Sequence, residues 1–122
     1  MPIVNVEIVL GAKDRVTQEL TQSLADVLGR VLKTPPGQTW VRVHALPHDR
    51  YAENDARLDA AQLPVFVTIL KRTIPGVTQL EAEVSALTNA VAKVVGRPAS
   101  CVHVEYAPAA SGRLAFGGAI VR

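Results

Sequence analysis

A proline at the second position is the residue of this sequence with the clearest chemical potential. Removal of Met1, which normally occurs when the next residue is small, leaves Pro2 with a free secondary amine. An α-amino group titrates at roughly 7.7 to 8.0, so it can accept or donate a proton near neutral pH. A proline can equally begin a strand, where its missing N–H costs nothing, and position alone leaves both interpretations open.

The histidines and the single cysteine do not have the spacing of a metal site. His44 and His103 alternate with apolar residues, as strand residues do. Cys101 and His103 would point to the same side of a strand without being forced into contact, which favours a structural cysteine over a nucleophile. No phosphate-binding glycine loop and no Gly-x-Ser-x-Gly motif is present. We therefore predict neither a metal nor a cofactor.

The composition excludes several classes of protein. The 122 residues carry a net charge of +2 with scattered basic residues, which gives little support to nucleic-acid binding and suits a small anionic ligand. The first ten residues lack the pattern of a secretory signal. No apolar run approaches the roughly 18 residues of a membrane helix. We expect a soluble, cytoplasmic, single-domain protein.

The chain divides into two copies of one unit, residues 2–62 and 64–122. Each copy opens with a proline followed by an apolar, β-branched run, and each has a second strand, predicted at 41–44 and 102–105. Residues 47–63 are predicted to form a connector, and residues 112–121 a terminal hairpin.

An amphipathic helix is predicted between the strands of each copy. Asp14 is the expected cap of the first helix and Pro35-Pro36 its expected end. Thr78 and Glu81 have the spacing of a capping box for the second helix, which Gly96 and Pro98 are expected to end.

The fold class that follows is α/β: two tandem β-α-β units forming a four-stranded sheet with both helices on one face. The other face, expected to be lined by Val, Ile and Leu, has no partner within the chain. Packing against further copies of the chain would cover it, so we predict a homo-oligomer.

This arrangement resembles the tautomerase superfamily over the entire chain, specifically the fused relatives of 4-oxalocrotonate tautomerase (4-OT). The resemblance rests on the two β-α-β copies and on the proline that opens each copy. It implies a trimer and assigns to Pro2 the role of general base or acid on small enol or 2-oxo acids. Pro64 holds the same place in the second copy, but its nitrogen is bonded to Leu63 and is a non-basic amide. One working site per chain is therefore expected.

The resemblance also implies residues that bind substrate. Lys71 and Arg72, at the end of the second copy's first strand, match substrate-binding arginines of the related cis-3-chloroacrylic acid dehalogenases, although a solvated basic strand end is an equal alternative. Arg42 matches the arginine on the second strand of the short members, and His103 is its counterpart in the second copy. Either of these two could face Pro2. Ala12 replaces another arginine of the short members.

Aromatic and apolar residues complete the expected site. Tyr51 takes the place of an aromatic wall residue in the first copy, and Leu114 takes it in the second, where Phe116 could also close the pocket. The alternative is that Tyr51 and Phe116 are ordinary core or interface aromatics. Leu114 also stands where the dehalogenases have a water-activating glutamate, which disfavours hydration chemistry.

The sequence thus predicts a cofactor-independent tautomerase that uses Pro2 to move a proton within a small anionic enol or keto acid. Three alternatives remain: a catalytically silent trimeric scaffold that binds small acids, a dehalogenase-like or hydratase-like member of the superfamily, and a secreted signal like macrophage migration inhibitory factor. The last lacks an export signal in this sequence.

Overall fold

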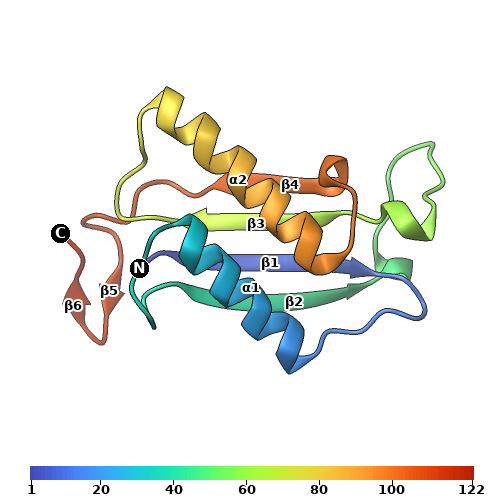
Figure 1. Ribbon diagram of the computed structural model, residues 1–122, viewed down its shortest axis with the longest axis horizontal. Helices are drawn as coiled ribbons and strands as arrows, with labels where there is room; N and C mark the ends of the chain where they lie inside the picture. Colours follow the sequence, from blue (N-terminus) through green and yellow to red (C-terminus); the bar gives the residue numbers. More distant parts are fainter.

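The computed structural model describes residues 1–122 as one four-stranded mixed sheet with two helices packed on one face (Figure 1). The first unit contains β1 (Ile3–Leu10), α1 (Gln18–Val31) and β2 (Trp40–Pro47). The second contains β3 (Val65–Leu70), α2 (Val77–Val95) and β4 (Val102–Tyr106). The predicted two β-α-β units are confirmed.

The strands are ordered β2-β1-β3-β4. Within each unit the two strands are parallel, as a helical crossover requires, and the central pair β1 and β3 is antiparallel. The predicted hairpin is also confirmed, as β5 (Ala115–Phe116) and β6 (Ala119–Ile120). It lies beyond the same end of the sheet as the N-terminus (Figure 1). Short 3-10 helices at His48–Arg50, Ala60–Gln62 and Ala99–Cys101 complete the chain. Neither α-helix is long and apolar enough to cross a membrane.

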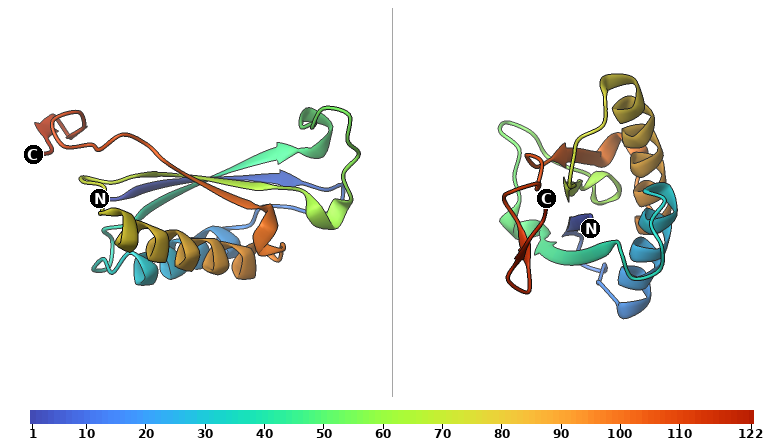
Figure 2. Two further views of the ribbon diagram at one scale, coloured as in Figure 1. Left: turned by 90° about the horizontal axis from the view of Figure 1, so that it is seen from above. Right: turned by 90° about the vertical axis from the view of Figure 1, so that its left-hand side faces the viewer.

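The core lies between the sheet and the helices, because alternate strand residues point to the same face. Strand residues 4, 6, 8, 65, 67 and 69 are at most 1% exposed and pack with Leu24 and Leu28 of α1 and Leu87 and Val91 of α2. The helices cover one face of the sheet and leave the other free (Figure 2).

The free face mixes apolar and polar residues, so the prediction that Val, Ile and Leu line it holds only in part. By strand register this face carries the apolar residues Ile3, Val9, Trp40, Leu46, Phe66 and Leu70 and the polar residues Asn5, Glu7, Arg42, His44, Thr68, His103 and Glu105. Most other β-branched residues of these strands point into the helix-covered core. Trp40 is 48% exposed, so the face keeps apolar surface that further copies of the chain would cover.

Three predicted helix boundaries are also wrong. Thr17, not Asp14, caps α1, with its Oγ1 accepting from Leu20 N at 3.1 Å. α1 ends at Val31, before Pro35-Pro36, and Lys33 adopts a left-handed φ of 56°. Gly76 precedes α2 without a side-chain cap, so Thr78 and Glu81 form no capping box. Gly96 ends α2 in the left-handed conformation, as predicted.

Candidate active site

Pro2 is buried at the start of β1, on the helix-covered side that Val4 and Val6 also face. Its carbonyl oxygen accepts from Trp40 N at 3.0 Å, which ties it to the first residue of β2. In the chain as encoded, Met1 is bonded to the Pro2 nitrogen, and its ammonium donates to Gln38 O at 2.9 Å. Removal of Met1 would therefore expose an amine that the sheet already holds in place.

Lys71 lies opposite Pro2 across the two central strands. Ile3 pairs with Leu70 in the antiparallel register of β1 and β3, and the next step along each strand brings Pro2 opposite Lys71. Strand parity directs Lys71 to the helix-covered side and Arg72 to the other. The sequence prediction that these cations stand near Pro2 thus agrees with the geometry of the chain.

A hollow of about 300 Å³ opens at this position. It is lined by Met1, Pro2, Lys71, Arg72, Thr73, Pro75 and Gln79. The last three residues come from the connection between β3 and α2 and from the first turns of α2. The hollow therefore brings the predicted base together with two cations and with neutral hydrogen-bonding groups.

Glu83 of α2 pairs with Lys71 at 2.8 Å, and the two side chains are 14% and 21% exposed. The other carboxylate oxygen of Glu83 accepts from the hydroxyl of Tyr106, on β4, at 2.5 Å. Burial raises the pKa of Tyr106 above its ordinary value, and the hydrogen bond to Glu83 and the charge of that carboxylate raise it further. Sequence reasoning missed both Glu83 and Tyr106, because only the packing of α2 on the sheet brings them to Lys71.

Arg72 is exposed and lies against the C-terminal segment. Its Nε donates to the main-chain oxygen of Arg122, and its own carbonyl accepts from Ser111 N at 3.1 Å. No acidic side chain pairs with its guanidinium. Arg72 is therefore the cation at the hollow without an acidic side-chain partner, while the oxygen of Arg122 accepts from its Nε.

Phe116 and Leu114 lie in the C-terminal segment, near the same end of the sheet. The Phe116 ring packs edge-on against Trp40, with centroids 4.9 Å apart and planes at 71°. Leu114 is half-buried and its carbonyl accepts from Val121 N at 2.7 Å. Neither residue lines the hollow.

Arg42, His103 and Tyr51 lie elsewhere within the chain. Arg42 is on the free face, where its Nε donates to Asn5 Oδ1 at 2.8 Å. His103 and Tyr51 flank Phe66 near the opposite end of β3, with ring centroids 5.5 and 5.9 Å from it. The hydrogen bond from Tyr51 to Glu53 is the main cause that raises the pKa of Tyr51 to about 12, with smaller contributions from desolvation and the charge of Glu53. Within one chain these three residues do not meet Pro2.

The second proline is enclosed. Pro64 is buried, its carbonyl accepts from Val9 N at 3.1 Å, and buried Leu63 is bonded to its nitrogen. Val9, which is fully buried, stands beside Pro64 where Lys71 stands beside Pro2. Arg97 donates to the carbonyls of Leu63 and Val9. The Pro64 end of the sheet therefore lacks both the cation and the open hollow that lie beside Pro2.

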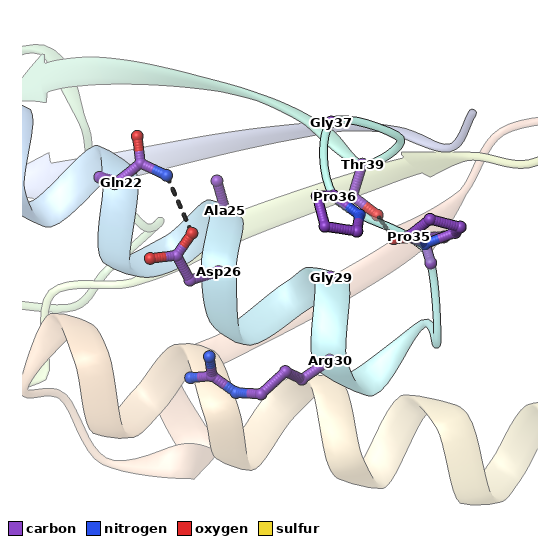
Figure 3. Close-up of a pocket in the computed structure, with 10 residues that line it drawn as sticks. Gln22, Ala25, Asp26, Gly29, Arg30, Pro35, Pro36, Gly37 and Thr39 are labelled. Atoms are coloured by element: carbon purple, nitrogen blue, oxygen red, sulfur yellow. Dashed lines mark hydrogen bonds between the residues drawn. The ribbon is translucent and has the colours of Figure 1, made fainter.

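A second hollow, of about 340 Å³, lies between α1 and the loop that leads to β2 (Figure 3). Its polar residues include Gln22, whose amide donates to Asp26 Oδ1 at 2.8 Å, and Arg30 (Figure 3). No group of three or more His, Cys, Asp or Glu side chains that could hold a metal ion occurs in the chain. The hollow beside Pro2 therefore remains the one that contains a predicted catalytic group.

Comparison with known structures shows that the chain shares its fold with fused 4-OT and macrophage migration inhibitory factor structures, which confirms the fold that the resemblance implied. The chain superposes on the R7 fused 4-OT wild-type asymmetric trimer with a TM-score of 0.77 at 17% identity, covering 97% of this chain and 94% of that chain. It is similar to Pt0534 inactivated by 2-oxo-3-pentynoate, with a TM-score of 0.75, 17% identity and coverage of 98% and 94%. It also matches macrophage migration inhibitory factor from Oncomelania hupensis, with a TM-score of 0.74, 15% identity and coverage of 100% and 83%. No protein-family model and no curated protein matches the sequence.

Proposed function

We propose that this chain is a tautomerase in which the Pro2 amine, freed by removal of Met1, transfers a proton within a small enol or 2-oxo acid. The observation that carries the proposal is the shared hollow of Pro2, Lys71 and Arg72. The fold supports it, since the similar structures include a fused 4-OT and a protein inactivated by 2-oxo-3-pentynoate.

The proposed reaction is an isomerisation that needs no oxidant or reductant. The lone pair of the neutral Pro2 nitrogen accepts the enol O–H proton, and the O–H electron pair forms the carbonyl as the C=C electrons move to carbon. The ammonium formed on Pro2 returns a proton to that carbon. Arg72 would bind the substrate carboxylate, and the Lys71 ammonium would stabilise charge on the enolate oxygen.

We further propose that the chain assembles as a homotrimer. A homotrimer, as in the fused 4-OT structures, would allow Arg42, His103 or Tyr51 to reach a site on a neighbouring copy. Phe116 and Leu114 would limit water access from the C-terminal segment. We also propose that the protein is cytoplasmic.

A small-acid-binding scaffold is the second candidate, because Ala12 stands where the short family members have an arginine, and a form that kept Met1 would have no free Pro2 amine. In that form the nitrogen is an amide that cannot accept a proton. The hollow would still offer Arg72 to an anion.

The test is ketonisation of phenylenolpyruvate and 2-hydroxymuconate by protein whose loss of Met1 is verified by mass. A preparation that retains Met1, in which the Pro2 nitrogen is an amide, should have a kcat/KM lower by about 10² to 10⁴-fold, the usual contribution of a general base. Pro2→Ala without Met1 replaces the positioned secondary amine by a primary amine and should also lower kcat/KM, with the oligomeric state unchanged. Equal activity of wild type and Pro2→Ala would contradict the role of Pro2, and inactivity of all forms would favour the scaffold.

A further inference from the structure

We infer that Glu83 and Tyr106 are positioning residues of the Pro2 site, which act by holding the ammonium of Lys71 in place beside Pro2. The inference rests on the proposed function and deepens it, since it adds two residues that the resemblance did not assign. Neither residue lines the hollow that contains Pro2. An effect of either one on the reaction therefore has to pass through Lys71, which does line it.

The three side chains form one series of contacts across three elements. Lys71 follows β3, Glu83 lies in the second turn of α2, and Tyr106 ends β4. Lys71 Nζ lies 2.8 Å from Glu83 Oε1, and the Tyr106 hydroxyl donates to Glu83 Oε2 at 2.5 Å. Each carboxylate oxygen thus has its own donor, so the carboxylate cannot turn away without losing a contact.

Burial distinguishes this arrangement from a surface ion pair. The side chains of Lys71 and Glu83 are 21% and 14% exposed, and Tyr106 is half-buried. Exposed pairs hold their side chains loosely, because water competes for both charges. Breaking a largely buried pair instead leaves a desolvated charge without its partner. The flexible four-carbon stem of Lys71 is therefore fixed by its contact with Glu83.

The ammonium held in this way borders the site of the proposed reaction. Lys71 lines the hollow of about 300 Å³ together with Pro2 and stands opposite it in the strand register. A lysine ammonium has three donors, and Glu83 is the one acceptor that Lys71 has within the chain. Two donors therefore remain for a substrate oxygen. A donor fixed before the substrate arrives stabilises the developing enolate charge without having to reorient.

The kinetic test measures kcat and KM for phenylenolpyruvate with protein freed of Met1. Glu83→Gln keeps the shape of the side chain and removes the ion pair, so it should lower kcat about tenfold and change KM less than about threefold, because a positioned donor acts mainly in the transition state. Tyr106→Phe should lower kcat about threefold, because the pair remains but the carboxylate loses one donor. Glu81→Gln, which removes the same charge from an exposed position on α2, is the matched control and should leave both constants unchanged.

A double-mutant cycle tests whether Glu83 acts through Lys71. Lys71→Met removes the ammonium and keeps an apolar stem, and in this background Glu83→Gln should change kcat by less than about twofold. Every variant keeps the same residues from any neighbouring copy, so the comparison holds however many cations reach the site in the assembled protein. Circular dichroism and size-exclusion chromatography establish that each variant folds and assembles as wild type does.

An NMR measurement separates this inference from the proposed reaction. Relaxation of the Lys71 ammonium should show an ordered group in wild type and Glu81→Gln, and a mobile one in Glu83→Gln. A Lys71 ammonium that stays equally ordered in Glu83→Gln would overturn the inference. So would an active enzyme whose kcat Glu83→Gln leaves unchanged, or a loss of kcat that is equal with and without Lys71. Absence of turnover in every form would overturn the tautomerase itself, and the order of Lys71 would still decide whether Glu83 holds the ammonium.

Discussion

The guanidinium of Arg97 lies 3.0 Å from the carboxylate of Asp14 and joins the end of α2 to the loop after β1. The same side chain donates to the carbonyls of Leu63 and Val9, and only 6% of it is exposed. These contacts close the end of the sheet that contains Pro64. At that end the charged side chain of Arg97 is buried among main-chain carbonyls, whereas at the Pro2 end the charged side chains of Lys71 and Arg72 border an open hollow.

Arg97→Ala should destabilise the protein by about 2 to 4 kcal/mol, because it removes the side-chain donor of two carbonyls and the ionic partner of Asp14, whose carboxylate then accepts only from Gly11 N. The free energy of unfolding in urea measures this loss. Arg57→Ala is the control: Arg57 is exposed and pairs with no acidic side chain, so its replacement should cost less than about 0.5 kcal/mol. Equal effects of the two variants would contradict the role given to Arg97.

Pro64→Ala should retain tautomerase activity within about threefold of wild type, whereas Pro2→Ala should lose it. The reason is chemical: the Pro64 nitrogen is an amide under buried Leu63, and Val9 replaces the cation that accompanies Pro2. Initial rates should be compared at equal folded concentration, checked by circular dichroism. A loss of activity with Pro64→Ala in folded protein would argue against a single site per chain.

Thr17→Ala should lower the free energy of unfolding by about 1 kcal/mol, since Thr17 Oγ1 caps α1. Thr78→Ala is the paired test of the capping box that the sequence suggested for α2. Because Thr78 is exposed and makes no cap, its replacement should change stability by less than about 0.5 kcal/mol. A larger effect at Thr78 than at Thr17 would reverse this assignment.

The Tyr106 hydroxyl should make the free energy of unfolding depend on pH in the alkaline range. The pKa of Tyr106 is raised in the folded state. Its hydroxyl therefore contributes fully to the free energy of unfolding below about pH 10. This contribution is lost as the pH rises further, because Tyr106 ionises at a lower pH in the unfolded chain than in the folded one. The stability difference between Tyr51→Phe and the double variant Tyr51→Phe/Tyr106→Phe should therefore narrow above about pH 10. In that background Tyr106 is the one remaining tyrosine of two. A difference that widens with pH would show that the folded state favours the ionised phenol.

Local pattern determined much of this protein. Alternating β-branched residues specified the strands, helical spacing specified α1 and α2, and the recurrence of a proline-led strand revealed the two units. Pro2, Lys71 and Arg72 could be proposed together because the family resemblance places a catalytic proline and substrate-binding cations at these strand ends. The helix caps were predicted less well: α1 begins after Thr17, and the carboxylate of Asp14 accepts instead from Gly11 N and from Arg97, a residue 83 positions distant.

Tertiary structure alone decided the charge of the site. The approach of Glu83 to Lys71, and of Tyr106 to Glu83, depends on how α2 lies across β3 and β4, and no spacing in the sequence encodes it. The mixture of polar and apolar residues on the free sheet face likewise became evident only when strand register fixed which residues share a side. Local propensity sets each element, whereas the electrostatics of a site arise from side chains that packing brings together from distant positions.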